Sequence, residues 1–155
     1  MNKIRMTLPT LLTGLISSLW ALNVCAGPSA DFIADSKLAP CPSTPNCVSS
    51  QAADQSQVIK ALAVTGDVAK QNAALLKVIA DMPRTEIKAQ IDNYLWVTFT
   101  TLIMRYVDDV EFILAEGEPI AVRSASRVGH SDLGTNRRRV ENIREALAAL
   151  EKPDQ

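Results

Sequence analysis

The hydrophobic residues change from a helical to a strand period near Pro83, and this change constrains the fold more than any other sequence feature. Before it, residues 67–81 carry one apolar helical stripe that includes Leu75 and Ile79. After it, four runs alternate with the period of a strand, at residues 86–91, 94–101, 107–115 and 120–127. A closing helix is predicted over residues 137–150, with Val140, Ile143, Leu147 and Leu150 facing inward.

This order of elements predicts an α+β fold. Strands joined by short turns pair as antiparallel hairpins, and the two helices must bury their apolar stripes against the sheet. We therefore expect a four-stranded antiparallel sheet with an N-terminal and a C-terminal helix packed on one face. Residues 38–51 precede these elements and contain three prolines, so we expect an irregular loop there.

The first 26 residues are typical of a secretory leader. A basic start precedes an uncharged, Leu-rich run, and small residues end it, as signal peptidase requires. We expect an exported protein, periplasmic or secreted, in which residues 1–26 are removed, residues 27–37 are a linker and residues 38–152 form one globular domain. Two alternatives stay open, because the run is long enough for an uncleaved membrane anchor and Cys25 is a possible lipid-attachment site.

Cys41 and Cys47 remain as a pair once the leader is gone. Five residues separate them, in a segment without helical or strand period. Redox-active pairs usually have two intervening residues at the start of a helix, so a structural disulfide closing a small loop is the preferred interpretation.

Strand alternation places charged residues on the face of the sheet away from the core. If the apolar side chains of the last two strands point inward, Asp109, Glu111, Arg123 and Arg127 share the opposite face and can form cross-strand pairs. Asp108 lies on the inward side, so its carboxylate must reach the sheet rim or pair with a buried donor.

Three arginines, Arg137 to Arg139, occupy the predicted first turn of the closing helix, where Asn136 is the expected cap. Positive charge there opposes the helix dipole, so these arginines require negative partners. The sheet acids are one possibility, and an anion bound beside Arg123, Arg127, Arg137 and Arg139 is the other. Arg138 points away from its neighbour and is free to be solvated.

The loop before that helix contains His130, Ser131 and Asp132, which could act together as a catalytic group. Adjacent residues in one loop do not make a triad, so a structural or exposed role is preferred for the single histidine. The acids of the third strand lie on two faces, which argues against a metal site. No phosphate-binding glycine loop, nucleophile elbow or zinc motif occurs, and we expect no cofactor.

Three segments resemble one known family. They are CPSTPNCVSS at residues 41–50, VDDVEF at 107–112 and VRSASRVGHSDLGTNRRRVENIR at 122–144, and they are similar to the bacterial and plant family catalogued as domain of unknown function 1499. The resemblance implies no established activity. It draws attention to Cys41, Pro42, Asn46, Cys47, Ser49, Ser50, Asp108, Asp109, Glu111, Arg123, Ser124, Ser126, Arg127, Gly129, Asp132, Gly134, Asn136 and Arg139. It also implies an aromatic residue where this chain has His130, which argues against catalysis by that histidine.

Three functions fit these features. The preferred one is a binding module that holds an anionic ligand or a protein partner with the arginines, oriented by Asp108, Asp109 and Glu111. The alternatives are a hydrolase-like enzyme with Asp108 or Asp109 as general base, and a structural envelope protein without a ligand. The net charge of −1 makes nucleic acid an unsuitable partner, and membrane contact is expected only through the N-terminus.

Overall fold

The computed structural model describes residues 37–64 and 66–151. The expected leader, nearly all of the expected linker and the last expected residue of the domain, Lys152, lie outside the described residues. Within the described part of the chain, no helix combines the length and the apolar character needed to cross a membrane.

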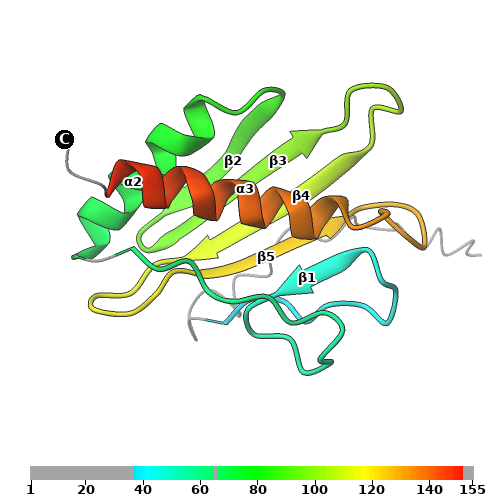
Figure 1. Ribbon diagram of the computed structural model, residues 1–155, viewed down its shortest axis with the longest axis horizontal. Helices are drawn as coiled ribbons and strands as arrows, with labels where there is room; N and C mark the ends of the chain where they lie inside the picture. The colour runs from blue at the N-terminus through cyan, green and yellow to red at the C-terminus, as the bar shows by residue number, and fades with distance from the viewer. Residues whose placement is uncertain (1–36, 65, 152–155) are drawn as a thin grey trace, which may run out of the picture.

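The protein is built on a five-stranded antiparallel sheet with the strand order β1-β5-β4-β3-β2 (Figure 1). Its strands are β1 (Cys47–Ser49), β2 (Thr85–Ile91), β3 (Tyr94–Thr100), β4 (Val107–Ile113) and β5 (Ala121–Ser126). The last four strands follow one another as hairpins, as the alternating runs predicted, and an irregularity between Ile87 and Ala89 shifts the register of the edge strand β2.

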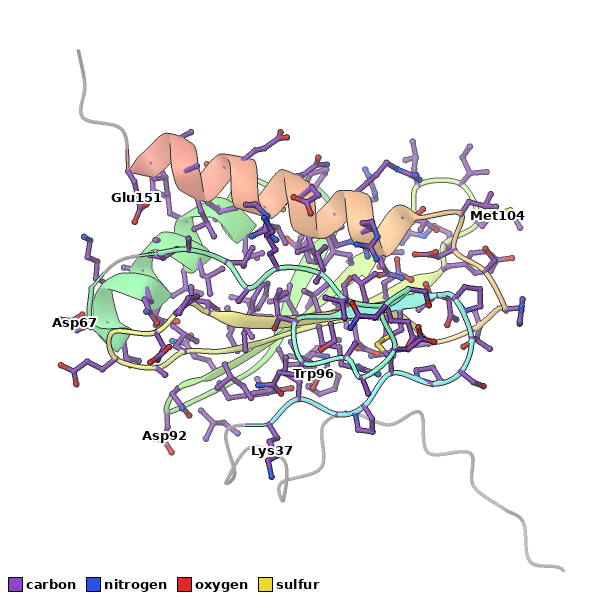
Figure 2. The ribbon with its side chains drawn as sticks, turned by 60° about the horizontal axis from the view of Figure 1, so that its bottom comes forward. Lys37, Asp67, Asp92, Trp96, Met104 and Glu151 are labelled. Atoms are coloured by element: carbon purple, nitrogen blue, oxygen red, sulfur yellow. A yellow bond between two sulfur atoms is a disulfide. The ribbon has the colours of Figure 1, made fainter. Side chains whose placement is uncertain are left out.

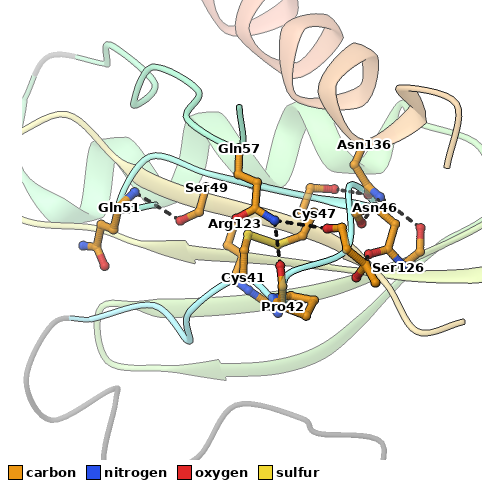
Figure 3. The surroundings of a disulfide bond; sticks show 12 residues. Cys41, Pro42, Asn46, Cys47, Ser49, Gln51, Gln57, Arg123, Ser126 and Asn136 are labelled. Atoms are coloured by element: carbon orange, nitrogen blue, oxygen red, sulfur yellow. Dashed lines mark hydrogen bonds between the residues drawn. A yellow bond between two sulfur atoms is a disulfide. The ribbon is translucent and has the colours of Figure 1, made fainter. Parts of the chain in front are cut away.

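The prediction of four strands was wrong, because β1 is a fifth strand inside the segment expected to be an irregular loop. Cys47 and Ser49 pair with Ala125 and Arg123 of β5. A three-residue strand is too short to show alternation, and the flanking prolines conceal it. The expected disulfide is present between Cys41 and Cys47, where it ties the chain to the start of this edge strand (Figure 3).

Both helices pack on the same face of the sheet (Figure 2). α2 (Val68–Ala80) begins at Asp67, whose side chain accepts a hydrogen bond from the Lys70 amide. α3 (Thr135–Leu150) buries Val140, Ile143 and Leu147, as predicted. The hydrophobic core lies between these helices and the inward side chains of β3, β4 and β5.

Two details of the closing helix differ from the prediction. Its cap is Gly134, and Asn136 is a fully buried residue of the first turn. The backbone amide of Asn136 is instead satisfied by Asp132, which frees the asparagine side chain to point into the protein. Leu150 is 40% exposed, because the helix extends beyond the core at its last turn.

Candidate functional site

An ion pair between β4 and α3 lies at the centre of the candidate site. The guanidinium of Arg139 donates to the carboxylate of Asp108, and the two side chains are 10% and 2% exposed. Arg139 also donates to Ser124 Oγ and Asn136 Oδ1, and its guanidinium carbon lies 4.9 Å from the centroid of the Phe99 ring. Asp108 therefore has the buried donor that its inward position requires.

Asn136 extends this pair into a buried polar network. Its side-chain amide donates to the carbonyl of Asn46 and to Ser126 Oγ, both at 3.0 Å (Figure 3). Its Oδ1 accepts from Ser124 at 2.6 Å. Asn46 in turn donates to the Gly129 carbonyl. The network thus fixes the start of α3 to β5 and to the chain that leads into β1.

The opposite face of the sheet carries two further ion pairs. Arg123 donates to Glu111 at 2.6 Å, and Arg127 binds Asp109 through two hydrogen bonds of 2.9 Å. The indole of Trp96 also donates to Asp109, at 2.8 Å. These are the cross-strand pairs that alternation predicts. They place Arg123 and Arg127 on the face away from α3, so the structure does not bring them together with Arg137 and Arg139 around one anion.

Arg137 and Arg138, in the first turn of α3, form hydrogen bonds with backbone carbonyls and a hydroxyl rather than with the sheet acids. Arg137 donates to the carbonyls of Ser56 and Val58, both at 2.9 Å, and so holds the segment after β1 against the helix. Arg138 is exposed and donates to the Leu133 carbonyl and to Thr135 Oγ1.

A hollow of about 430 Å³ lies beside the buried pair, in the size range of small-molecule sites. The turn after α2, the end of β3 and the first turns of α3 form its walls. Its lining includes the basic residues Arg84, Arg138 and Arg139 and the apolar residues Phe99 and Leu102. None of the described residues that line it carries a carboxylate.

A second hollow, of about 480 Å³, shares Thr101 and Thr135 with the first. It lies between the β3–β4 loop and the β5–α3 loop, and its lining includes Asp108, Ser131 and Asp132. The two hollows thus meet at the end of the sheet where Asp108 pairs with α3. His130 is exposed in the adjoining loop.

Backbone strain gathers around the same end of the sheet. The described residues include four non-glycine residues with positive φ, and three of them, Arg84, Arg105 and Leu133, belong to the turn and the two loops that border the hollows. A left-handed conformation costs an ordinary side chain about 1–2 kcal/mol, and proteins retain such strain mainly at functional sites. No pattern in the sequence distinguishes Arg84, Phe99 or Arg105 as site residues, because neither backbone strain nor a hollow leaves a residue pattern.

The carboxylates considered as general bases are already engaged. Asp108 is bound by Arg139, and both oxygens of Asp109 accept hydrogen bonds from Arg127. Within the described residues, no group of three or more His, Cys, Asp or Glu side chains is placed to hold a metal ion.

Residues 37–147 match the model of a family described as Protein of unknown function (DUF1499). No curated protein and no solved structure matches the chain. The match covers every described strand and all but the end of α3, and it includes Asp108, Asn136 and Arg139 of the buried network.

Replacing Asp108 by Asn should lower the free energy of unfolding by about 3 kcal/mol, because it leaves the buried guanidinium of Arg139 without its counter-charge. Asp109→Asn is the matched control. Its partner Arg127 is 29% exposed, so the expected loss is only about 1 kcal/mol. Urea unfolding followed by circular dichroism measures both values, and equal small losses would contradict the role given to the Asp108–Arg139 pair.

Because of Tyr94, the free energy of unfolding should decrease in strongly alkaline solution. Burial and the adjacent Glu111 carboxylate, to which the Tyr94 hydroxyl donates, raise the pKa of this phenol far above its ordinary value. A group whose pKa is raised by folding stabilises the protein fully below its unfolded-state pKa, about 10, and loses that contribution as the pH rises further. The stability difference between the wild type and Tyr94→Phe should therefore shrink above about pH 10; a constant difference would contradict this account.

Proposed function

Since the chain belongs to the family described as Protein of unknown function (DUF1499), whose description states no activity, we propose a function from its geometry. The protein is an exported binding module, and its ligand is an amphiphilic anion that occupies the first hollow. Its acidic group lies against Arg84 and Arg138, and its apolar part lies against Phe99 and Leu102.

The observation that carries this proposal is the uncompensated positive charge of the hollow. Arg139 is neutralised by Asp108, but neither Arg84 nor Arg138 forms an ion pair with a described carboxylate. Arg84 donates its Nε–H to the Thr100 carbonyl, and Arg138 uses its two terminal nitrogens on Leu133 and Thr135. Both guanidinium groups retain further N–H donors, which an anionic group can accept as charge-assisted hydrogen bonds.

The apolar lining argues for an amphiphile rather than for a small inorganic anion. The aromatic ring of Phe99 forms part of the wall, together with Met82, Pro83 and Leu102. Burial of a hydrocarbon group against such a surface is favourable, whereas a fully hydrated ion has no apolar surface to bury there. The disulfide supports the exported location, because structural disulfides persist in oxidising compartments.

Calorimetric titration with octyl phosphate below its micellar concentration tests the proposal. We expect saturable binding of one molecule per chain, with much weaker binding of inorganic phosphate and of the uncharged amphiphile octyl glucoside. Arg84→Gln and Arg138→Gln should each weaken binding about tenfold, which corresponds to about 1.4 kcal/mol.

Lys70→Gln is the control, since it removes one positive charge at an exposed position in the first turn of α2, outside the lining of the hollow. Equal weakening by all three variants would indicate long-range electrostatics only. Absence of binding by octyl phosphate would remove the support for a ligand and favour a purely structural protein.

A further inference from the structure

Large apolar side chains are exposed mainly at one end of the sheet. Nine such residues are exposed in the described part of the chain, and six of them lie on two loops at this end: Leu102, Ile103, Met104, Tyr106, Val128 and Leu133. We call these six residues the apolar rim. The first four belong to the β3–β4 loop and the last two to the β5–α3 loop, and Figure 2 shows Met104 at the far end of the molecule from Asp92.

The two loops form one continuous surface. Tyr106, Val128 and Leu133 line the same hollow between them, and Leu102 borders the other hollow. Ile103 and Leu133 are 85% and 84% exposed, which is nearly complete for side chains of this kind. Single apolar residues scattered on a surface need no explanation, whereas exposed apolar side chains gathered on two neighbouring loops are expected at a contact surface.

Each of the two loops that carry the apolar rim contains a residue with a strained backbone conformation. Arg105 and Leu133 both have left-handed backbone conformations, with φ of 56° and 54°. Neither residue gains core packing in return, because Leu133 is exposed and Arg105 lies at the loop surface. Strained backbone of this kind is concentrated at binding and functional sites.

The charge around the apolar rim is positive. Residues 101–106 contain Arg105 and no acid, and Arg84 and Arg138 lie on the adjoining hollow. Two acids line the hollow between the rim loops. Asp132 accepts hydrogen bonds from the backbone amides of Gly134 and Asn136, and Asp108 is paired with Arg139. The net charge of the whole chain is −1, so this end differs in sign from the protein as a whole.

We propose that the apolar rim is a docking surface for an anionic lipid membrane, with the rim side chains inserted below the headgroups and Arg105 among the phosphates. Aliphatic side chains at a loop tip beside arginines have the chemistry that the membrane interface recognises. The rim is mainly aliphatic, and the positive charge around it complements the phosphates of an anionic membrane surface. This surface adjoins the ligand site proposed for the first hollow, with which it shares Leu102, and it adds to any contact through the N-terminus.

Flotation of the full chain with vesicles tests the proposal. Binding to vesicles of phosphatidylcholine with phosphatidylglycerol should exceed binding to phosphatidylcholine alone, and Ile103→Asp should weaken it at least tenfold. Ile91→Asp is the matched control, because Ile91 is also exposed, at 52%, but lies at the opposite end of the sheet. Equal effects of the two variants would overturn the proposal.

A local probe keeps the test decisive even if the N-terminal residues hold the chain to vesicles by themselves. Ile103→Trp should gain a fluorescence component that lipids brominated on their acyl chains quench, whereas Ile91→Trp should show no quenching beyond that of the wild type. Unquenched fluorescence of Ile103→Trp on anionic vesicles would overturn membrane insertion. So would self-association of the wild type, without vesicle binding, that Ile103→Asp abolishes, because the rim would then join two copies of the chain.

Discussion

The buried pair of Asp108 and Arg139 is the contact on which the rest of this structure depends. Each charge would be costly inside a protein without the other, so β4 and the N-terminal part of α3 must meet at one defined position. Asn136 then adds hydrogen bonds to β5 and to the chain before β1, and the edge strand is fixed by the same network. One polar cluster thereby determines both how the helix lies on the sheet and where the loops at that end are held.

The arginines on the outer face of the sheet are ion-paired, whereas two arginines at its end form no ion pair with a described carboxylate. On the face away from the helices, Arg123 and Arg127 are paired with Glu111 and Asp109, so their charges are satisfied internally. At the end of the sheet, Arg84 and Arg138 bind backbone carbonyls and a hydroxyl and retain their positive charge. The proposed ligand and membrane contacts both depend on this positive charge. They share Leu102, but Arg84 and Arg138 test the ligand site and Ile103 tests the membrane contact.

The helical and strand periods were sufficient to predict both helices and four of the strands. Alternation also placed Asp109 and Glu111 on one face with Arg123 and Arg127, because it determines which side chains share a face. These periods could not reveal β1, whose three residues are too few to show a period. The arrangement of the arginines in the candidate site could not be predicted from the sequence. Arg138 and Arg139 are adjacent in the sequence, yet one is exposed and the other is buried against Asp108, and that difference arises from the docking of α3. Arg84 joins them only because the turn after α2 folds against the end of β3.

The central claim is that this protein binds its partners at the end of the sheet where α3 begins. A map of backbone amide chemical shifts in the presence of octyl phosphate tests it most directly. The account predicts that the largest changes occur in the turn at residues 82–84, in residues 99–102 and in the first turns of α3. Changes centred on β1, the disulfide and the face that carries Arg123 would contradict it, as would changes spread evenly over the molecule.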